Sequence, residues 1–468
     1  MTELINRVSQ VAELLDARLI GDDTEFFRVR TDSRTIAIDD LFVALVGDKF
    51  DGAEYLDMAI ERGAVAAIVQ SQQQSDLPQI VVKDTRLALG KIAKAWRDQF
   101  TLPLVAVTGS NGKTTVKELV EFIMRNVGPG MVTTGNLNNE IGVPLTILKV
   151  SPFDTWGVVE MGASAVGDIK YLTDIVRPTI ALVNNSGKAH LGGFGSAEQV
   201  ASTKGEIYSG LTDDGVALIN GDLEQAELWS SLAEGKKIVL YGFEQSSEKD
   251  YIVSSTTESM QNIDAPFELV TEDERVTIDL PLLGVNNRKN AVAAAAIALQ
   301  LGVSMQQIKR GIENVRPIDA RLDVVVDEEY VEVIDDSYNA SPESVSGAID
   351  VLSSRDGKKV LVLGDMAELG ADSTALHAEI GSKASANIDK IYAIGEHAED
   401  YLSTFSGIGE KFADIKSLCN KISQDIIEHK YNRDNGNEKI ALLVKGSRSM
   451  HMERVIEHLL QKNVGGGM

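Results

Sequence analysis

The sequence predicts an α/β protein of three domains, on the basis of three observations. Short apolar segments alternate with amphipathic helical segments along most of the 468 residues, which is the order of a parallel α/β sheet. A compact apolar strand, a glycine loop and an amphipathic helix follow one another over residues 102–127. After residue 316 the alternation starts again, and a chain of this length is expected to hold two to four domains of roughly 150 residues each.

Residues 1–84 are expected to form a small α/β N-terminal domain. "RVSQVAELLDARLIG" has apolar residues at helical spacing, and "EYLDMAIERGA" is a helix that ends at Gly63. "DLFVALVG" and "AVAAIVQS" are predicted as buried strands, and "SQQQSD" as a polar loop.

Residues 85–315 are expected to form the central domain, beginning with a connecting helix at "TRLALGKIAKAWRDQF". Helical segments lie between several apolar strands, which predicts a parallel sheet. The strands are "LPLVAVTG", "WGVVEMGA", "TIALVNN", "GVALING" and "KIVLYGF". The more strictly alternating stretch from "DYIVSSTTE" to "RVTIDLPL" predicts an antiparallel flank.

Residues 316–468 are expected to form a Rossmann-like C-terminal domain, with the break near Arg316 and Pro317. Each strand there ends in a polar or glycine-rich loop with a helix after it, as in "VEVIDDSYN", "KVLVLGDMAELG", "KIYAIGEH" and "IALLVKGSRS". Ligands of such sheets bind outside the carboxyl ends of the strands.

The composition excludes several classes of protein. A formal net charge of -25 argues against broad nucleic-acid binding, because that binding needs Lys and Arg. The single cysteine, Cys419, allows no intrachain disulfide, which fits a reducing compartment. The N-terminus has no apolar signal core, and the longest apolar stretch is too short to span a bilayer. We expect a cytoplasmic monomer that binds small molecules.

The stretch "VTGSNGKTTVKEL" resembles a phosphate-binding loop but departs from the pattern G-x-x-x-x-G-K-[ST]. Gly112, Lys113 and Thr114 fit, whereas Val107 stands where the first glycine belongs. The flanking strand and helix favour nucleotide binding over an ordinary strand-to-helix turn. Lys113 would then reach the β- and γ-phosphates, and Thr114 would bind Mg²⁺.

Three further residues are candidates because of their positions. Glu160 ends an apolar strand, where a Mg²⁺ ligand belongs; the alternative is a solvated acid. His190 lies in the glycine-rich stretch "NNSGKAHLGGFGS" after another strand, and alone it is better explained as a loop histidine. Lys204, in "STKGEIY", alone would be a lysine on a helix surface.

Taken together, six ordered motifs resemble the Mur ligases, the ATP-dependent amide-forming enzymes of peptidoglycan synthesis. They are "VTGSNGKTT", "VVEMGAS", "NNSGKAHLGGFGS", "TKGEIYSGL", "GVNNRKNAVAAAA" and "DDSYNASPES", and they cover nearly the whole chain. The loop T-G-x-N-G-K-[ST] of that family lacks the usual first glycine, which accounts for Val107. "NLNNEIGVPLTIL", "AHLGGFGS" and "VLGDMAELG" are most similar to the members that add D-alanyl-D-alanine to UDP-N-acetylmuramoyl-tripeptide through an acyl phosphate.

The resemblance implies a catalytic and nucleotide site. Lys113 would contact the transferred phosphate, Thr114 and Glu160 would hold one Mg²⁺, and His190 a second. Lys204 would carry a carbamate derived from CO₂, an anionic oxygen ligand suited to a hard cation. The ATP-binding residues would be Thr108, Gly109, Ser110, Asn111, Gly112, Lys113, Thr114 and Thr115, with Asn287 and Asn290 near the adenine and Arg321 and Asp336 near the phosphates and ribose.

The resemblance also implies a substrate path. Ser33 and Arg34 would contact the uridine diphosphate, and Asn136, Asn138 and Asn139 would line the muramoyl and peptide path. Asn339, Ser341 and Asp365 are candidates for the dipeptide pocket, with local turn capping as the alternative for these polar loop residues. The chain departs from the family at Asn286 and at Ala53, where His is usual.

Three other functions remain as alternatives. Another ligase on this scaffold, such as folylpolyglutamate synthase or a different Mur ligase, would differ in its amino acceptor. A GTPase-type switch would need an N-K-x-D motif, and a dinucleotide-dependent redox enzyme would need G-x-G-x-x-G after a strand of the C-terminal sheet. The sequence contains neither motif in that place.

Overall fold

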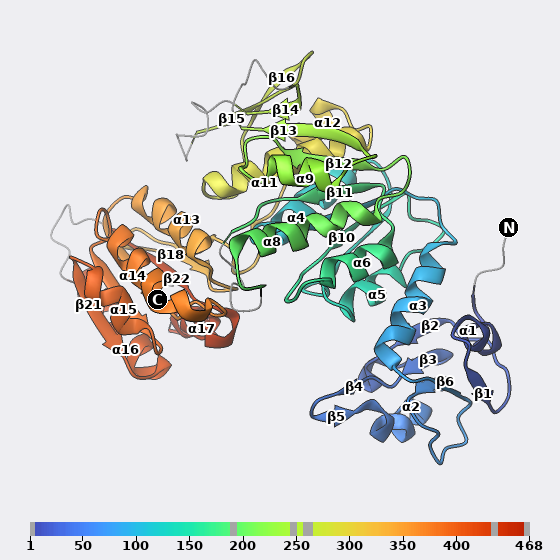
Figure 1. Ribbon diagram of the computed structural model, residues 1–468. Helices are drawn as coiled ribbons and strands as arrows, with labels where there is room; N and C mark the ends of the chain where they lie inside the picture. Colours follow the sequence, from blue (N-terminus) through green and yellow to red (C-terminus); the bar gives the residue numbers. More distant parts are fainter. Residues whose placement is uncertain (1–4, 188–193, 244–249, 256–264, 432–438, 463–468) are drawn as a thin grey trace.

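The computed structural model describes residues 5–187, 194–243, 250–255, 265–431 and 439–462. Within these ranges it contains one large sheet in each of the three segments of the chain (Figure 1). The predicted three-domain α/β fold class is confirmed. The residue numbers at which one domain gives way to the next, 84/85 and 315/316, stay predictions. None of the described helices is long and apolar enough to cross a membrane.

The N-terminal sheet is mostly parallel, and only β1 runs antiparallel to its neighbour β7. In spatial order its strands are β1 (Arg18–Ile20), β7 (Gln79–Val81), β6 (Ala64–Val69), β3 (Asp40–Val43) and β2 (Arg28–Arg30). A small ribbon of β4 (Val46–Gly47) and β5 (Phe50–Asp51) stands beside it. The helices are α1 (Val8–Leu14) and α2 (Leu56–Glu61).

Helix α3 (Thr85–Arg97) joins the first two domains (Figure 1). Asp84 caps it by accepting hydrogen bonds from the backbone N–H groups of Arg86 and Leu87 at 2.8 and 3.0 Å. Leu89 and Ile92 pack into the N-terminal core, whereas Ala93 packs into the core of the central domain. The helix therefore belongs to both hydrophobic cores.

The central sheet has parallel strands at its centre and an antiparallel flank at one edge, as predicted. In spatial order its strands are β16 (Arg275–Ile278), β15 (Phe267–Val270), β14 (Tyr251–Ser254), β13 (Lys237–Gly242), β12 (Val216–Asn220), β11 (Ile180–Val183), β8 (Leu104–Thr108), β10 (Trp156–Glu160) and β9 (Gly130–Val132). The helices are α4 (Lys113–Met124), α5 (Gly142–Ile147), α6 (Asp168–Val176), α8 (Ala197–Gly205), α9 (Ala226–Leu232), α11 (Val285–Gln300) and α12 (Met305–Glu313).

Strand β8 shows why an uninterrupted apolar run is needed in this sheet. All of its residues are buried, and successive side chains point to opposite faces. Val105 and Val107 pack into the core formed with α4, α11 and α12, while Leu104 and Ala106 pack into the core formed with α5 and α6. Two hydrophobic cores, one on each face, therefore fix the strand that carries the glycine loop.

The C-terminal sheet is parallel apart from its edge strand β17, and helices cover both of its faces (Figure 1). In spatial order its strands are β17 (Asp323–Asp327), β18 (Val331–Asp336), β22 (Ile440–Lys445), β19 (Lys358–Leu363), β20 (Lys390–Ile394) and β21 (Ile408–Phe412). Helices α13 (Pro342–Ser353), α14 (Ser373–Ala384) and α15 (Ala398–Thr404) pack on one face, and α16 (Ile415–Tyr431) and α17 (Glu453–Gln461) on the other.

Candidate active site

The carboxyl ends of the central and C-terminal sheets line one cavity of about 950 Å³. On the central side the lining follows β8, β10 and β11, and on the other side it follows β18 and β22. Strand β8 pairs with β10 on one edge and β11 on the other, so its loop lies at the topological switch point of the sheet. This is the place where open α/β sheets bind their ligands.

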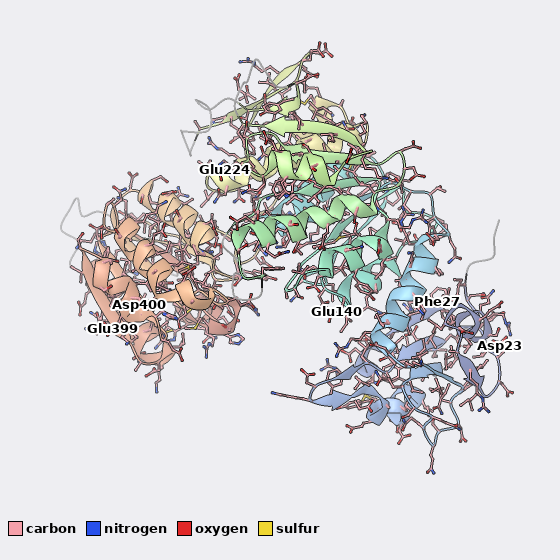
Figure 2. All side chains as sticks on the ribbon, viewed as in Figure 1. Asp23, Phe27, Glu140, Glu224, Glu399 and Asp400 are labelled. Atoms are coloured by element: carbon pink, nitrogen blue, oxygen red, sulfur yellow. The ribbon has the colours of Figure 1, made fainter. Side chains whose placement is uncertain are left out.

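The negative charge of the chain is spread widely and is not confined to this cavity. The labelled acids Asp23, Glu140, Glu224, Glu399 and Asp400 lie on all three domains (Figure 2). An anionic ligand in a chain of net charge -25 must therefore be held by local donors.

The glycine loop after β8 is held in place by asparagines from other elements. Asn111 N donates to Asn185 Oδ1 at 2.8 Å, and Asn184 Nδ2 donates to Asn111 O at 3.0 Å. Gly112, the N-cap of α4, has φ = 77°, a left-handed conformation that favours glycine. A Cβ added there would lie 2.4 Å from Asn290 Oδ1, so a side chain is also excluded by space.

Lys113 folds back over its own loop and faces the cavity. Its Nζ donates to Gly109 O at 2.8 Å and lies 3.5 Å from Ser110 O. Burial lowers the pKa of Lys113, and the carboxylate of Glu160 opposes that shift. The side chain is thus a half-buried donor beside the loop amides.

Thr114 and Glu160 come together as predicted residues of one oxygen-rich cluster. Thr114 Oγ1 donates to Glu160 Oε2 at 2.9 Å, and Asn138 Nδ2 donates to Glu160 Oε1 at 2.8 Å. Glu160 is 2% exposed, and its backbone N–H donates to Thr133 Oγ1 at 2.9 Å. A hydroxyl and a carboxylate held this way have the donor chemistry that Mg²⁺ prefers.

Lys204 lies on α8, is 2% exposed and lines the same cavity. Burial, and secondarily the charge of Lys113, lower the pKa of Lys204 to about 7. No described residue accepts a hydrogen bond from its Nζ. The alternative of a helix-surface lysine is therefore wrong. His190 lies outside the described residues.

The remaining predicted nucleotide residues surround the loop. Thr108 is buried, and its Oγ1 donates to Met161 O at 2.8 Å, whereas Thr115 faces the cavity. Asn290 Oδ1 accepts from Asn184 Nδ2 at 2.9 Å, and Asn290 Nδ2 donates to Asn287 Oδ1 at 3.3 Å. The buried amides of α11 therefore continue the asparagine network that supports the loop.

The C-terminal domain reaches the loop through two hydrogen bonds. Arg321 Nη2 donates to Thr114 Oγ1 at 3.1 Å, and Ser341 Oγ donates to Asn111 Oδ1 at 3.0 Å. Ala320 and Leu322, on either side of Arg321, both have left-handed backbones with φ of 56° and 54°. Such backbone strain persists only where the surrounding structure enforces it. Here it flanks Arg321, whose side chain reaches Thr114 of the central domain.

Sequence reasoning missed Lys445, which ends β22. Its Nζ lies 2.6 Å from Asp336 Oδ2 and donates to Asn339 O at 2.8 Å, and both charged side chains are almost fully buried. Burial raises the pKa of Asp336, and Lys445 opposes that shift. The signal was present, because "IALLVKGSRS" places a lysine directly after an apolar strand. Asn184 and Asn185 were missed in the same way beside His190.

The predicted substrate residues of the central domain line the cavity, whereas those of the N-terminal domain do not. Asn136 and Asn138 line the cavity, and so does Asn139, whose Oδ1 also accepts from Gly142 N at 2.9 Å at the start of α5. Ser33 is buried in the N-terminal domain, and the exposed Arg34 pairs with Asp32 at 2.8 Å. Both lie away from the cavity.

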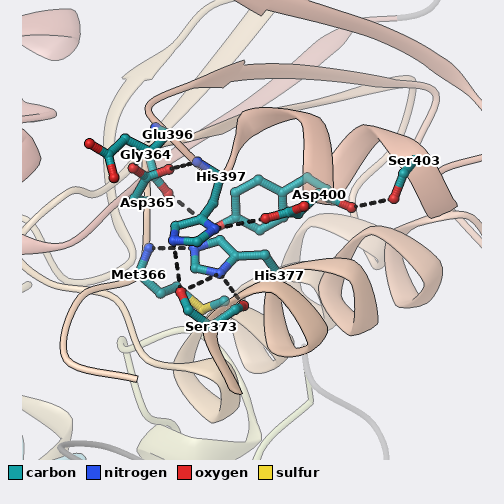
Figure 3. A network of polar contacts seen from close by, with 10 residues as sticks. Gly364, Asp365, Met366, Ser373, His377, Glu396, His397, Asp400 and Ser403 are labelled. Carbon is teal, nitrogen blue, oxygen red and sulfur yellow. Dashed lines mark hydrogen bonds and ion pairs between the residues drawn. The ribbon is translucent and has the colours of Figure 1, made fainter. Parts of the chain in front are cut away.

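Asp365 lies in a closed polar network of the C-terminal domain (Figure 3). Its carboxylate accepts from Glu396 N at 2.8 Å and from His397 N at 3.1 Å. The rings of His377 and His397 stack with centroids 4.3 Å apart. His377 Nε2 accepts from Met366 N at 3.0 Å, while its Nδ1 lies 2.7 Å from Ser373 O. These contacts fasten the loop after β19 to its own domain.

The fold and the cavity define a nucleotide-dependent enzyme that works between two α/β domains. Comparison with known families agrees. Residues 26–97 match the family described as Mur ligase family, catalytic domain, residues 107–298 match the Mur ligase middle domain, and residues 320–448 match the Mur ligase, glutamate ligase domain. The chain belongs to the Mur ligase family.

Individual relatives are similar over nearly their whole length. A UDP-N-acetylmuramoyl-tripeptide--D-alanyl-D-alanine ligase from Escherichia coli (strain K12) is 40% identical over 457 residues, which cover 97% of this chain and 98% of the relative. A crystal structure of MurF from Acinetobacter baumannii has a TM-score of 0.88 at 33% identity, covering 97% and 98% of the two chains. MurF ligase from Thermotoga maritima in complex with ADP has a TM-score of 0.79 at 28% identity, covering 93% and 97%.

Proposed function

We propose that this chain is the ATP-dependent ligase that joins D-alanyl-D-alanine to UDP-N-acetylmuramoyl-tripeptide in peptidoglycan precursor synthesis. The observation that carries the proposal is the meeting of Lys113, Thr114 and Glu160 with Arg321 and Asp336 in one cavity. The similarity to curated ligases of this activity over 97% of the chain supports the choice of substrates.

The chemistry requires activation of a carboxylate. A carboxylate does not acylate an amine at neutral pH, because oxide is a poor leaving group. Transfer of the γ-phosphoryl group from ATP gives an acyl phosphate and ADP. The amine of the dipeptide then attacks the acyl carbon, and inorganic phosphate leaves as the amide forms. Water must be kept from the acyl phosphate, which suits a site enclosed between two domains.

The residues of the chain supply donors for the moving charge. Lys113 and the amides of the loop would face the transferred phosphoryl group, and Arg321 would approach it from the C-terminal domain. Asn287 and Asn290 would flank the adenine, and Asp336 the ribose. The buried contact of Lys445 with Asp336 supports a fixed position for that carboxylate.

Magnesium would be held first by Thr114 and Glu160, whose oxygen atoms already converge. Bound Mg²⁺ would offset negative charge on the phosphates. Asn138 would keep Glu160 oriented through the second carboxylate oxygen. His190 belongs to the proposed second set only through its family motif.

Lys204 is proposed to carry a carbamate in the active enzyme. A neutral amine is needed to react with CO₂, and a pKa of about 7 leaves a large fraction of Lys204 uncharged at neutral pH. Carbamylation also replaces repulsion from Lys113 by attraction, because the product is an anion. The Nζ is buried at the cavity wall and has no hydrogen-bond partner among the described residues, which supports this assignment.

The proposal also assigns roles to the domains. Residues 1–84 would bind the uridine diphosphate sugar through Ser33 and Arg34, residues 85–315 would bind ATP, and residues 316–468 would bind the dipeptide. Asn136, Asn138 and Asn139 would line the peptide path, with Asn339, Ser341 and Asp365 toward the dipeptide. The proposal includes a monomer working in the cytoplasm; sedimentation would test the oligomeric state.

Phosphate release tests the proposal directly. The protein is supplied with ATP, Mg²⁺ and UDP-N-acetylmuramoyl-tripeptide, with and without D-alanyl-D-alanine. We expect stoichiometric phosphate and ligated product only when the dipeptide is present. Turnover with a different amino acceptor or a folate substrate, and none with this pair, would assign the chain to another branch of the scaffold.

A further inference from the structure

The helix that begins at the glycine loop contains a second lysine, Lys117, which has no part in the function proposed above. It lies on α4 three residues after Thr114, so the two side chains stand on the same face of the helix, one turn apart. Lys117 is 2% exposed. A lysine is almost never buried in this way unless its ammonium group has partners. The partners of Lys117 therefore show what the side chain does there.

Two oxygen atoms lie close to the ammonium group of Lys117. Its Nζ is 2.6 Å from Glu118 Oε1 and donates to Thr133 O at 2.9 Å. The carboxylate of Glu118 compensates the charge, which a buried ammonium group requires. Thr133 is fully buried and directly follows β9. Lys117 thus joins α4 to the point at which the chain leaves the central sheet.

The hydrogen bonds of Thr133 depart from the regular parallel pattern at one position. Strand β9 pairs with β10 up to Val132 and Val158, and Thr133 N continues the pairing by donating to Val158 O at 3.1 Å. In a continued ladder the next bond would run from Glu160 N to the backbone carbonyl of Thr133. Instead Thr133 Oγ1 accepts from Glu160 N at 2.9 Å, and the carbonyl accepts from Lys117. The lysine therefore occupies the carbonyl that the ladder would otherwise use.

The chain leaves the ladder as the segment 133–139, and this segment returns to Glu160. Asn138 Nδ2 donates to Glu160 Oε1 at 2.8 Å, and Asn138 O accepts from Gly162 N at 2.8 Å. The other carboxylate oxygen of Glu160 accepts from Thr114 Oγ1 at 2.9 Å. The backbone of Glu160 is therefore held from one end of the segment, and its carboxylate from the other end and from α4.

We propose that Lys117 is a positioning residue, which sets the orientation of the Glu160 carboxylate for Mg²⁺ by holding the segment 133–139 away from the ladder. This role rests on the proposed function, in which Glu160 binds Mg²⁺. Without the ammonium group the buried carbonyl of Thr133 loses its donor, which is costly. The carbonyl then takes the N–H of Glu160, as in a regular ladder, and the segment turns with it. Asn138 leaves the carboxylate, which becomes free to rotate.

The first test measures metal binding directly. Mn²⁺ binds the same oxygen ligands as Mg²⁺, and free Mn²⁺ can be followed by electron paramagnetic resonance. The unaltered protein and Lys117→Met are titrated with Mn²⁺ in the presence of ADP. We expect the substitution to weaken Mn²⁺ binding by about tenfold, with a change of less than about twofold in the dissociation constant of ADP without metal. Equal Mn²⁺ affinity in the two folded proteins would overturn the role of Lys117. No Mn²⁺ binding by the unaltered protein would overturn the proposed metal site itself.

Variants of Thr133 test the same connection from its other side, and they serve also if Lys117→Met does not fold. Thr133→Val removes the hydroxyl that accepts from Glu160 N, whereas Thr133→Ser keeps it. We expect Thr133→Val to weaken Mn²⁺ binding by about tenfold and Thr133→Ser by less than about twofold. If Thr133→Val binds Mn²⁺ as tightly as Thr133→Ser, the connection is wrong.

The double variant Lys117→Met with Thr133→Val shows whether the two residues act through one chain of contacts. Mn²⁺ binding should then be weakened no more than in either single variant, because each substitution already breaks that chain. Losses that multiply would show that the two residues act independently, and would overturn the proposed connection.

Lys149→Met is the matched control. The exposed Lys149 donates to Thr134 Oγ1 at 3.2 Å, so it contacts the same segment one residue beyond the Thr133 carbonyl. This variant should bind Mn²⁺ like the unaltered protein. An equal loss in Lys149→Met and Lys117→Met would show that any disturbance of the segment weakens the metal site, and would overturn a specific role for Lys117. A merely structural lysine predicts a lower thermal unfolding midpoint in Lys117→Met with unchanged Mn²⁺ affinity.

Discussion

Two loops of this protein both begin with glycine after an apolar strand, but their polar groups have different partners. Residues 109–112 follow the apolar strand β8, and residues 364–372 follow the apolar strand β19. The first loop is bonded to Asn184 and Asn185 of its own sheet and to Ser341 of the next domain, and it lines the large cavity. The second loop is bonded within its own domain to His377 and to the segment after β20, and it does not line that cavity.

The difference shows what a loop at the end of a strand does and does not reveal. The sheet topology places both loops at carboxyl edges, where ligands bind. Whether a polar group faces a ligand or stabilises its own backbone depends on partners distant in the sequence. Substitutions at four positions test this contrast.

The largest effect is expected from Lys113→Ala in the first loop. It removes the half-buried ammonium beside the proposed phosphate site, and we expect ligation to fall by at least about 10³-fold. The thermal unfolding midpoint should stay close to that of the unaltered protein. Lys91→Ala, on the exposed side of α3, is the control and should keep full activity. Near-normal turnover in a folded Lys113→Ala protein would remove this loop from the chemistry.

Lys445→Met tests the support behind the cavity on the C-terminal side. It leaves the Asp336 carboxylate buried without its partner, which costs about 3–5 kcal/mol of stability. Urea unfolding by circular dichroism and amide exchange in β18 and β22 would measure the loss. The double variant Lys445→Met with Asp336→Asn should recover most of it. Equal stability of the single variant and the unaltered protein would show that the pair does not stabilise the fold.

Lys204→Ala and Lys204→Arg separate a carbamate from an ordinary lysine. We expect both to lose most activity, on the order of 10²-fold, because neither can form the anion. Short-chain carboxylic acids should restore part of the activity of Lys204→Ala by filling the vacated space, but not that of Lys204→Arg. The carbamate and the metal set built on it are wrong if both variants match the unaltered enzyme at low CO₂.

The smallest effect is expected from the titration of His377, which lies on α14 and accepts a hydrogen bond from Met366 N of the second loop (Figure 3). Burial lowers the pKa of His377; nearby His397 also lowers it, while the contact with Ser373 O and the charges of Asp365 and Asp400 oppose the shift. Because the unfolded chain takes up the proton first, this contribution to stability is complete above about pH 6.5 and is lost as pH falls through the lower pKa of the folded state.

His377→Gln provides the comparison for that titration. Protonation of His377 would displace the Met366 N–H from Nε2 and lose a hydrogen bond worth about 1 kcal/mol. Urea unfolding at pH 7.5, 6.5 and 5.5 should show a decline in the unaltered protein that is weaker in His377→Gln. The same slope in both proteins would show that His377 does not titrate in this range.

Much of the fold was predictable, because a strand that is buried on both faces of its sheet is an uninterrupted apolar run in the sequence. The apolar run "LPLVAVTG" predicted β8, and runs of the same kind predicted β10, β11, β18 and β22. In each of the two sheets the carboxyl ends of these strands lie at one edge. Glu160 was found because it ends such a strand, whereas Asp336 was named only because "DDSYN" resembles a family motif; both line the cavity. The family and the fold class are confirmed, and the phosphate-binding role of the loop stays a prediction.

The rest of the site depends on contacts that no local pattern encodes. Ser341 and Asn111 are 230 residues apart, and Arg321 and Thr114 are 207 apart, yet each pair is joined by a hydrogen bond. Lys445 was missed because its ion-pair partner, Asp336, lies more than a hundred residues earlier in the chain. Asp365 remains a predicted dipeptide residue, although its carboxylate oxygens accept from Glu396 N and His397 N.

The strained segment around Arg321 has a consequence for timing. Any movement of the C-terminal domain away from the central one must break both the Arg321–Thr114 and the Ser341–Asn111 hydrogen bonds. Under the proposed function, the positive charge of Arg321 would be withdrawn from the phosphates whenever the domains separate. On the same basis, the negative charge of the phosphates is fully compensated only while the central and C-terminal domains are in contact. Under that function, ATP bound to the central domain alone would lack the charge of Arg321.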